Sequence, residues 1–440
     1  MRVVDDLAAP RPRVYTEGWQ SWSPTGWWQP GDPWPAPPQH AVEDAMRRRP
    51  GRPVPDATLR GEGLVLVDPG DGGPVRSYAA TGPEHEVPSI DVTVTGGRVA
   101  VRADGPVEVI EAPGVVAAFD AVARSWTGGG GGGAGAPAPR VWCSWYQYFE
   151  DVTAADVVEN VHAIDRLGLP VDVVQLDDGW VGPTGELLRP RPEFGSVADV
   201  LAEIRGTGRQ AGVWLAPFVV GASSTVAREH PDWLVGLAGY NWRDDLVGLD
   251  LTHPGVRGFL VEAAERVRAL GAGYVKADFL YAGAVPGDRY DRTVSGTEAY
   301  RSGLRLLREA LGPDVYLVGC GAPVLPSVGL VDAMRVSPDT FHEGGEDGSA
   351  GLRGRASLEA RAWQHGRLWA NDPDCAVLRP SFALRAEWER VVTRFGGLRS
   401  FSDRVGDLDD RGLAAARRLL DDPPPTGPLP DEVVTAAVPR

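Results

Sequence analysis

A single lysine, Lys276, stands two residues before Asp278 in an otherwise apolar run of the sequence. The chain has 44 lysine and arginine residues in all, and Lys276 is the one lysine among them. In a sequence where nearly every basic residue is arginine, a lysine indicates a position that the wide, planar guanidinium of arginine cannot fill. The alternative interpretation is that Lys276 is an ordinary surface lysine without a function, but a surface lysine seldom lies inside an apolar strand pattern. The pair therefore predicts a chemically active strand end.

Carboxylates, indoles and one further cation follow other apolar runs, where the strands of a parallel sheet would end. The residues of this kind are Trp142, Trp145, Asp177, Asp178, Trp214, Cys320, Arg335, Asp339, Asn371, Asp372 and Asp374. Carboxylates accept pairs of hydroxyl hydrogens, and indole faces stack on the apolar side of a sugar ring. If these side chains meet at one mouth, they predict a pocket for a polyhydroxylated ligand, and a carbohydrate is the natural substrate.

Each motif also has a purely structural interpretation. Asp177-Asp178-Gly179 is a common ending of a strand, and Asn371-Asp372-Pro373-Asp374 is a possible turn before a strand. Cys320 has no histidine partner in a recognisable pattern, so a small buried side chain is favoured over a nucleophile. The tryptophans expected on helices in the core are Trp363, Trp369 and Trp388.

The overall charge and the cysteine count limit the class of protein. A net charge of −16 argues against nucleic acid or an anionic membrane as a partner. Three widely spaced cysteines favour free thiols in a reducing compartment, so a cytoplasmic location is expected. The N-terminal residues have no signal-peptide pattern, and no apolar stretch is long enough to span a membrane. The seven histidines are scattered, so we expect neither a metal nor another cofactor.

Strand-like and helix-like patterns alternate through the second part of the chain. The eight predicted strands are Val141–Trp145, Val171–Leu176, Gly212–Pro217, Tyr274–Phe279, Val315–Gly319, Ala333–Val336, Cys375–Leu378 and Leu398–Phe401. The amphipathic segments between them include Ala155–Leu167, Gly258–Leu270, Ala299–Leu311 and Leu413–Leu420. This pattern predicts an α/β fold, a (β/α)8 TIM barrel at residues 140–422, with its active site at the strand C-termini. A doubly wound sheet is the alternative, but the first strand is not followed by a glycine-rich phosphate loop.

Short β-branched runs precede the barrel. They are Leu64–Val67, Ile90–Thr95 and Val99–Val101, which predict a small antiparallel β domain at residues 1–126. Its Tyr15–Trp34 segment holds five tryptophans, and we expect this aromatic loop to cover something. A Gly/Ala/Pro linker at residues 127–139 and a Pro-rich tail at residues 423–440 complete the predicted organisation.

Seven motifs in the same order resemble glycoside hydrolase family 36, the α-galactosidases or melibiases. They are Gly18-Trp-Gln-Ser-Trp22, Trp142-Cys-Ser-Trp145, Asp177-Asp-Gly-Trp180, Trp214 in Gly-Val-Trp-Leu-Ala-Pro, Lys276-Ala-Asp278, Arg335-Val-Ser-Pro-Asp339 and Asn371-Asp-Pro-Asp374. Single motifs are weak, but seven in register over the whole barrel are specific. The N-terminal domain is shorter than the family's, and the family's C-terminal β-sandwich is not expected after the last helix.

The resemblance implies roles for individual residues. Asp278 corresponds to the nucleophile and Asp339 to the acid/base of a retaining, double-displacement hydrolysis of terminal α-D-galactosides, which needs two carboxyls about 5–5.5 Å apart. It assigns Asp177 and Asp178 to the 4- and 6-hydroxyls of galactose. The other substrate-binding residues that it implies are Trp214, Lys276, Cys320, Arg335, Trp142, Trp145, Trp19 and Trp22. Lys276, and in part Arg335, would keep Asp278 ionised.

Three other functions stay open. Ala277 replaces a bulkier family residue, which would enlarge the pocket floor for an α-N-acetylgalactosaminidase or another α-glycosidase. Lys276 could form a Schiff base in an aldolase-like lyase. A non-catalytic sugar-binding protein is the third alternative, although both candidate catalytic carboxylates are present. A small oligosaccharide or glycoside is the expected partner, and the oligomeric state is open.

Overall fold

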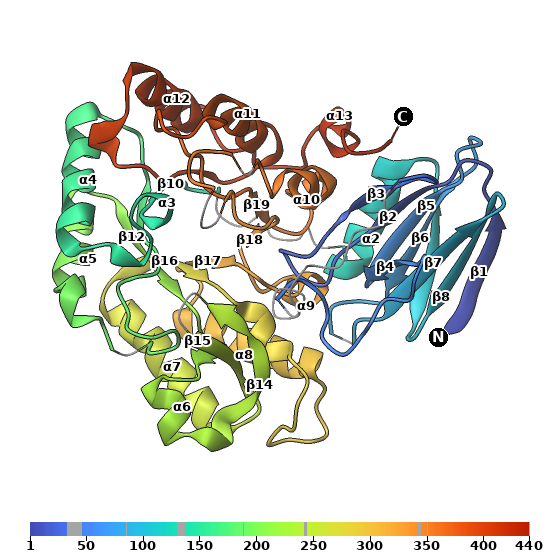
Figure 1. Ribbon diagram of the computed structural model, residues 1–440, viewed down its shortest axis with the longest axis horizontal. Helices are drawn as coiled ribbons and strands as arrows, with labels where there is room; N and C mark the ends of the chain where they lie inside the picture. The colour runs from blue at the N-terminus through green and yellow to red at the C-terminus, as the bar shows by residue number, and fades with distance from the viewer. Residues whose placement is uncertain are drawn as a thin grey trace.

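The computed structural model describes all residues except 33–45, 85, 130–136, 188, 242–243, 342–344, 350 and 440. In Figure 1 an antiparallel β domain lies against one side of an α/β barrel. Most of the predicted Gly/Ala/Pro linker, 127–139, falls on residues 130–136 and so lies outside the described residues. The same is true of Trp34 in the aromatic loop.

Eight parallel strands form the barrel sheet, in the order β19-β18-β17-β16-β12-β11-β10-β20. Their bounds are β10 Arg140–Cys143, β11 Val173–Leu176, β12 Gln210–Leu215, β16 Ala272–Ala277, β17 Tyr316–Gly319, β18 Ala333–Arg335, β19 Ala370–Asp372 and β20 Arg399–Phe401. The amides of Gly397 and Leu398, just before β20, donate to the carbonyl of Asn371 in β19, at 2.7 and 3.0 Å. These bonds draw the two ends of the sheet together, so the predicted barrel is confirmed.

The seventh predicted strand, Cys375–Leu378, is wrong. The strand that pairs with β18 is β19, in which Asn371 lies opposite Met334 and Asp372 opposite Arg335. Cys375–Leu378 makes only a single bridge, between Ala376 and Phe401, among the described strands. Pro373 has no N–H to donate and ends the ladder, so the apolar run after it falls outside the sheet.

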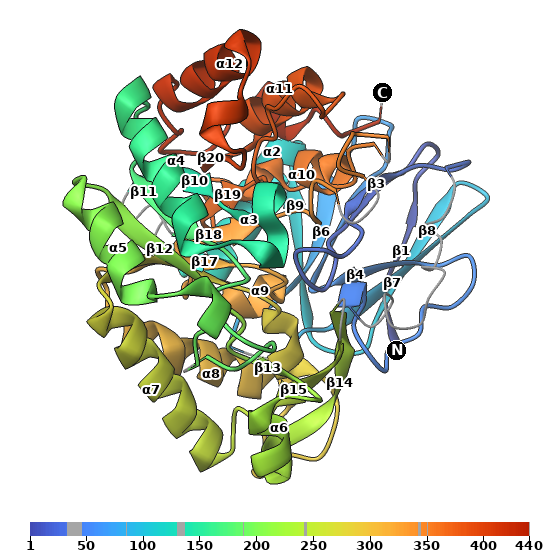
Figure 2. The same cartoon turned by 60° about the vertical axis from the view of Figure 1, so that its left-hand side comes forward.

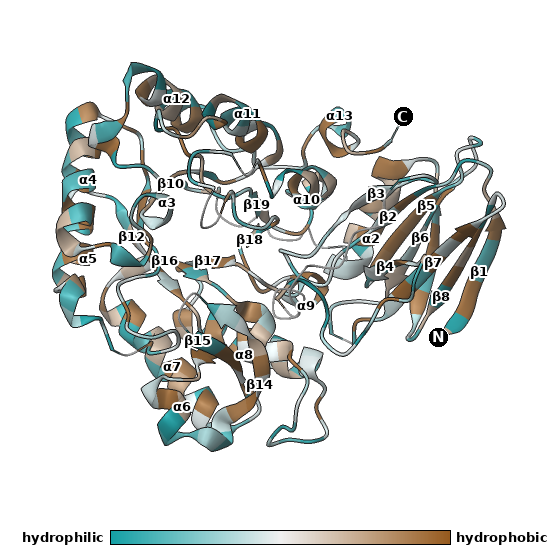
Figure 3. Cartoon of the chain, viewed as in Figure 1, coloured by the Kyte–Doolittle hydropathy of each residue, from teal (hydrophilic) through white to brown (hydrophobic). Residues whose placement is uncertain are grey.

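Helices cover the outside of the barrel, where Figure 3 shows polar and apolar residues on different sides of α4 and α12. The longer ones are α4 Ala154–Leu167, α5 Val197–Gly206, α7 Pro254–Ala269, α8 Gly296–Leu311, α11 Arg385–Phe395 and α12 Asp410–Asp421. Local sequence sets their starts: Thr153 with Asp156, and Ser295 with Glu298, form capping boxes for α4 and α8. Shorter helices are α3 Trp145–Tyr148, α6 Thr225–Glu229, α9 Val324–Ser327, α10 Arg355–Ala360 and α13 Asp431–Val434.

The barrel interior is filled on its N-terminal side by a cluster of apolar side chains. These are Val141, Val173, Tyr274, Tyr316, Val318, Ala333 and Leu398, from six of the strands or their flanks. Tyr274 and Tyr316 stack with ring centroids 5.7 Å apart. This apolar layer closes the barrel interior on that side, so a ligand in the interior would enter from the C-terminal ends of the strands.

An additional antiparallel sheet, which the sequence did not predict, is inserted between β12 and β16. Its strands are β13 Val219–Gly221, β14 Leu234–Asn241 and β15 Asp244–Leu249, with β15 in the middle. Figure 2 shows β14 and β15 projecting from the barrel towards the N-terminal domain. This insertion extends the wall on one side of the barrel mouth.

The N-terminal domain is a sandwich of two antiparallel sheets, which confirms the predicted β domain. One sheet has the order β1-β8-β7-β4 and the other β3-β2-β5-β6-β9. The strands are β1 Arg2–Ala8, β2 Arg13–Thr16, β3 Gly26–Trp28, β4 Leu59–Glu62, β5 Leu64–Asp68, β6 Val75–Ala80, β7 Ser89–Thr95, β8 Arg98–Ala103 and β9 Val107–Ala112. Helix α2 (Val115–Thr127) covers the second sheet, and its Phe119 stacks on Trp363 of the barrel at 4.6 Å. The sandwich therefore shares a core with the barrel.

The tail returns to the sandwich. The guanidinium of Arg13, in β2, donates to the carbonyl of Pro439 at 2.7 Å, and in Figure 1 the chain runs from α13 towards the sandwich. Val433 and Val434 of α13 are buried. Among the described residues, no helix combines the length and apolar character needed to cross a membrane.

Candidate active site

Lys276 and Asp278 lie on the same face at the end of β16, because successive side chains of a strand point to opposite faces. The Nζ atom of Lys276 lies 3.1 Å from Oδ2 of Asp177 and 3.7 Å from Oδ2 of Asp278. Ala277, between them, points away from the mouth into the buried core. The expectation that Ala277 enlarges the pocket floor is therefore wrong.

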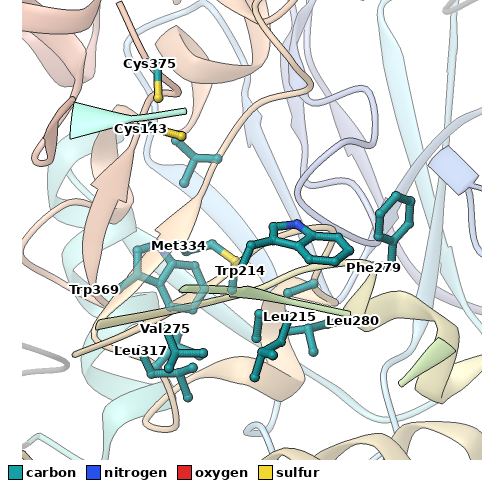
Figure 4. Close-up of a cluster of buried hydrophobic side chains, with 14 of the residues drawn as sticks. Cys143, Trp214, Leu215, Val275, Phe279, Leu280, Leu317, Met334, Trp369 and Cys375 are labelled. Carbon is teal, nitrogen blue, oxygen red and sulfur yellow. The ribbon is translucent and has the colours of Figure 1, made fainter. Parts of the chain in front are cut away.

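Asp278 is held by two further donors. Nε1 of Trp214, at the end of β12, donates to its Oδ2 at 3.0 Å, and the amide of Phe279 donates to its Oδ1 at 2.7 Å. Phe279 adopts the left-handed region with φ of 52°, an uncommon conformation for a bulky residue. The rings of Trp214 and Phe279 lie edge to face (Figure 4). The sharp turn after β16 thus fixes the orientation of the carboxylate.

Lys276 is a permanent cation in this setting. Burial lowers the pKa of its ammonium, but the charges of Asp177 and Asp278 outweigh burial and raise the pKa well above the usual value. Two carboxylates therefore share one ammonium at the end of β16.

Asp177 and Asp178 end β11 in a turn that is also part of the site. Oδ2 of Asp177 accepts from the side-chain amide (Nε2) of Gln175 and from Sγ of Cys143 in addition to Lys276. Gly179 has φ of 110°, and a Cβ there would lie 2.8 Å from the carbonyl of Glu150. Burial, together with the charges of Asp177 and Asp278, raises the pKa of Asp178 to about 7, against an opposing contribution from the Gly179 amide. The tandem carboxylates thus differ: one is paired with Lys276, and the other gains a proton near neutral pH.

Arg335, at the end of β18, joins two other carboxylates. Its Nη2 atom lies 2.7 Å from Oδ1 of Asp339 and 2.7 Å from Oδ2 of Asp374. Asp374 is buried and also accepts from the hydroxyl of Tyr146 and from the amide and hydroxyl of Thr340. Asp339 is more open, with 33% of its side chain exposed. Arg335 is thus paired with Asp339 and Asp374. The sequence suggested that Arg335 would in part keep Asp278 ionised, but Arg335 forms its ion pairs with these two other carboxylates.

Cys320 lies between the two groups. Burial is the main reason why the pKa of its thiol is raised well above the usual value. The negative charges of Asp278 and Asp339 add to this rise in pKa, and the positive charges of Arg335 and Lys276 oppose it. Because β17 pairs with β16 on one side and with β18 on the other, Cys320, directly after β17, lies between the ends of those two strands.

The four other predicted indoles lie in different surroundings. Trp145 is nearly buried on α3, next to Phe149. Trp142 is fully buried and donates to the carbonyl of Asp403, which ties β10 to the segment after β20.

Trp22 reaches the barrel from the N-terminal domain and packs edge to face on Phe279, with ring centroids 5.4 Å apart. Trp19 is buried under the guanidinium of Arg49. The aromatic loop therefore covers the barrel mouth through Trp22. Trp363, Trp369 and Trp388 are all buried, as expected of core residues, although Trp369 lies beside β19 and not on a helix.

A buried interdomain cluster was missed by the sequence reasoning. Nε of Arg361 donates to Oε1 of Glu17 at 2.8 Å, and its Nη atoms donate to the carbonyls of Gln20, Ser21 and Val336. Arg361 thus contacts the backbone just before Trp22 and just after Arg335. Arg361 and its charged partner Glu17 are 344 positions apart in the chain, so no local pattern reveals the pair.

Among the described residues, no group of three or more His, Cys, Asp or Glu side chains has an arrangement that could hold a metal ion. The chemistry available here is that of carboxylates, one ammonium, one guanidinium and aromatic faces.

Comparisons with known proteins connect this geometry to a family. The melibiase family model matches residues 136–301, which hold the ends of β10, β11, β12 and β16. The chain is 27% identical to the α-galactosidase TtGalA of Thermus thermophilus, with a TM-score of 0.78 over 94% of this chain and 86% of that one. That structure contains p-nitrophenyl α-D-galactopyranoside, and a second structure of the same enzyme contains stachyose.

Two curated relatives match shorter segments. The bifunctional α-galactosidase/sucrose kinase AgaSK of Mediterraneibacter gnavus is 27% identical over 104 residues, 22% of this chain and 11% of that protein. The α-galactosidase AgaA of Geobacillus stearothermophilus is 28% identical over 137 residues, 29% of this chain and 18% of that protein. These matches thus span less than a fifth of the relatives' length.

Proposed function

Since this chain carries a melibiase domain on the fold of the family 36 α-galactosidases, we propose that it hydrolyses terminal α-D-galactosides with retention of configuration. The observation that carries the proposal is the pair of strand ends on the two sides of β17: β16 is followed by Asp278, next to Lys276, and β18 by Asp339, next to Arg335. A retaining glycosidase needs two carboxyl groups with separate roles on the two sides of one glycosidic bond.

Asp278 is the proposed nucleophile. The indole N–H of Trp214 and the amide of Phe279 orient its two oxygens, and the Lys276 ammonium lies 3.7 Å away. These contacts hold the carboxylate in one orientation for attack on the anomeric carbon, which forms a glycosyl-enzyme. In this mechanism Lys276 acts through its charge and forms no covalent bond with the substrate.

Asp339 is the proposed acid/base. It protonates the leaving oxygen in the first step and removes a proton from water in the second. Its side chain is the most exposed of the paired carboxylates at the mouth, as contact with a leaving group and with water requires. Arg335 keeps Asp374 as a partner when Asp339 takes up a proton, so the buried guanidinium is never left unpaired.

Asp177 and Asp178 are proposed to bind the 4- and 6-hydroxyls of galactose. Asp177 is fixed by Lys276, Gln175 and Cys143, which suits a rigid acceptor for an axial hydroxyl. A glucoside would leave this acceptor without its hydroxyl, and unpaired buried polar groups are costly. Trp214 and Trp22 would form the apolar walls.

The Schiff-base alternative is disfavoured by the state of Lys276. A nucleophilic lysine must be neutral, whereas the charges of Asp177 and Asp278 raise the pKa of this ammonium. The α-N-acetylgalactosaminidase alternative loses its structural basis, since Ala277 points away from the mouth.

The proposal is tested by hydrolysis of p-nitrophenyl α-D-galactopyranoside with the unmodified enzyme, Asp278→Asn and Asp339→Asn. We expect both variants to lose at least about 10³-fold in kcat, because each removes a group that acts in the transition state. NMR of the first product should show the α-anomer of galactose. Equal turnover by all three proteins would remove both assignments, and a β-anomer would remove the retaining mechanism.

A further inference from the structure

Asp374 is the buried carboxylate that shares Arg335 with Asp339, and neither step of the proposed reaction uses it directly. Its side chain is only 4% exposed. Its Oδ1 atom accepts from the amide of Cys375 at 2.8 Å, and its Oδ2 atom accepts from the hydroxyl of Tyr146. A buried carboxylate with this many protein donors has little left to offer a substrate. Any effect of Asp374 on the reaction must therefore pass through its neighbours.

Two separate connections join Asp374 to Asp339. The first runs through side chains, because Nη2 of Arg335 lies 2.7 Å from Oδ1 of Asp339 and 2.7 Å from Oδ2 of Asp374. The second runs through the backbone: Oδ2 of Asp374 accepts from the amide of Thr340, the residue after Asp339, at 2.7 Å. The hydroxyl of Thr340 donates to the same oxygen at 2.8 Å. One buried carboxylate thus holds both the cation and the backbone next to the proposed acid/base.

Arg335 depends on Asp374 for its place. Among the described residues, Asp339 and Asp374 are the only hydrogen-bond or ion-pair partners of the Arg335 side chain. Asp339 is 33% exposed and takes part in the reaction, whereas Asp374 is buried and comes from the segment after β19. Asp374 therefore anchors the guanidinium, and the anchored guanidinium places Asp339.

This arrangement leaves one oxygen of Asp339 for the substrate. Oδ1 accepts from Nη2 of Arg335 at 2.7 Å, and Oδ2 accepts no hydrogen bond from the part of the chain that the structure describes. A general acid must lie within hydrogen-bond reach of the oxygen that it protonates. Because Oδ1 is fixed, the direction of Oδ2 towards a leaving oxygen is fixed as well.

The backbone at Asp374 is an independent sign of a functional position. Its φ of 82° lies in the left-handed region, which few residues other than glycine adopt. The described non-glycine residues with positive φ include Phe149, Phe279 and Asp374, which lie in the segments after β10, β16 and β19 at the C-terminal end of the barrel. Such strain persists where surrounding contacts compensate for it, and it gathers at active sites.

We propose that Asp374 is the positioning residue of the acid/base, which anchors Arg335 and the Thr340 backbone so that Oδ2 of Asp339 meets the leaving oxygen. This inference rests on the proposed function and deepens it. In the first step the bond between C1 and the leaving oxygen breaks, a carboxylate oxygen of Asp278 bonds to C1, and the proton of Asp339 moves to the leaving oxygen. Asp374 makes and breaks no bond, so its loss impairs the proton transfer.

The size of this effect depends on the leaving group. p-Nitrophenolate leaves with little help from an acid, whereas methoxide must be protonated as it leaves. The value of kcat/KM covers the steps up to the glycosyl-enzyme. The ratio of kcat/KM for methyl α-D-galactopyranoside to that for p-nitrophenyl α-D-galactopyranoside therefore measures acid catalysis. A change that only weakens the fold lowers both values equally and leaves the ratio unchanged.

Asp374→Asn is the diagnostic variant, and Tyr146→Phe is a milder one that removes a single donor to Asp374. The matched control is Asp403→Asn, because Asp403 is another buried carboxylate, after β20, that accepts from the amide of Leu378 and pairs with Arg379. We expect the ratio to fall at least about tenfold in Asp374→Asn and about threefold in Tyr146→Phe, as partial losses of general acid catalysis. The control should stay within about twofold of the unmodified enzyme.

Asp339→Asn gives the reference for complete loss of the acid, and its ratio should fall furthest. An unchanged ratio in Asp374→Asn, or an equal fall in Asp403→Asn, overturns the inference, and the proposed function stands as long as Asp339→Asn lowers the ratio. If Asp374→Asn does not fold, Tyr146→Phe decides by the same criterion. If the unmodified enzyme hydrolyses neither galactoside, the proposed function fails and the inference fails with it.

Discussion

Two buried ionic clusters in this molecule have opposite characters. In the interface cluster, between the sandwich and the barrel, Glu17 and Arg361 are 0% exposed. Arg361, the hydroxyl of Tyr15 and the side-chain amide of Gln364 satisfy both oxygens of Glu17 at 2.7–2.8 Å. In the mouth cluster, Lys276 stands between Asp177 and Asp278. There the negative groups outnumber the positive one.

This difference separates structural charge from functional charge. The interface cluster is neutral, and its carboxylate and guanidinium point at protein partners, so it offers nothing to a ligand. The mouth cluster carries excess negative charge beside partly exposed carboxylates, and hydroxyl donors from a substrate would complete its hydrogen bonding. Burial of charge alone therefore does not mark a site, whereas burial with incomplete pairing does.

The largest expected effect comes from removing the cation of the mouth cluster. In Lys276→Met, Asp177 and Asp278 lose their shared ammonium, so we expect kcat/KM for p-nitrophenyl α-D-galactopyranoside to fall by about 10²–10³-fold, in line with the loss of a preorganised charge. Lys276→Arg should recover less than a tenth of the activity, because the planar fork cannot take the place of a compact ammonium. Steady-state kinetics at fixed pH measures both. Full activity in Lys276→Arg would show that charge alone suffices at this position.

The interface cluster should respond in stability more than in catalysis. We expect Arg361→Met to destabilise the fold by about 3–5 kcal/mol, since it leaves the Glu17 carboxylate buried without its cation. The double variant Glu17→Gln/Arg361→Met should regain at least half of that loss, because no unpaired charge remains. Denaturant midpoints measure the stability, and kcat per folded molecule should stay within about threefold of the unmodified enzyme. A double variant as unstable as the single one would contradict the assignment of a charge-pairing role.

Local pattern was sufficient to predict the barrel and most of its mouth, and it failed where tertiary contacts decide. Apolar runs separated by amphipathic segments located seven of the eight strands, and the ionisable residues that follow them gave Asp177, Lys276 and Arg335. Strand β19 was missed because it contains Asn371 and Asp372, and the side chain of Asn371 is stabilised by a hydrogen bond to the carbonyl of Arg361. Hydrophobic periodicity cannot detect a polar strand of this kind.

Long-range pairing was equally invisible in the sequence. Glu17 and Arg361 carry no local signal of their partnership, and Asp374 stood among the strand-end residues without a role until its contacts with Arg335 and Tyr146 were seen. The inserted strands β13, β14 and β15 also escaped prediction, although Asn241 of β14 and Asp244 of β15 line a cavity of about 760 Å³ beside Asp178.

A smaller effect, on the pH dependence of stability, should distinguish Asp178 from its paired neighbour Asp177. Burial raises the pKa of Asp178 to about 7 in the folded protein, above the ordinary value of 3.8 that applies to the unfolded chain. The folded state therefore favours the protonated form, and this contribution to stability is complete below pH 4 and lost as the pH rises through about 7. Asp178→Asn mimics the protonated form at every pH.

We accordingly expect the thermal midpoint of Asp178→Asn, relative to the unmodified protein, to rise by a few degrees between pH 5 and pH 8.5. Taking the difference at each pH removes the contributions of all other groups. Asp177→Asn is the matched control and should show no such increase, because it removes a partner of Lys276 at both pH values. A constant difference for Asp178→Asn would mean that this carboxyl does not titrate near neutrality.

The smallest effect is expected at Cys320, which lies among the charges of the mouth yet is itself neutral. Burial raises the pKa of its thiol, and a thiol that stays protonated is a poor nucleophile. Cys320→Ala removes one buried atom and no charge, so kcat/KM should fall by less than about fivefold. Iodoacetamide at pH 8 should leave the activity of the unmodified enzyme unchanged over an hour. Rapid inactivation of the unmodified enzyme, but not of Cys320→Ala, would show that this thiol is reactive. Cys320 would then not differ in reactivity from the charged groups around it.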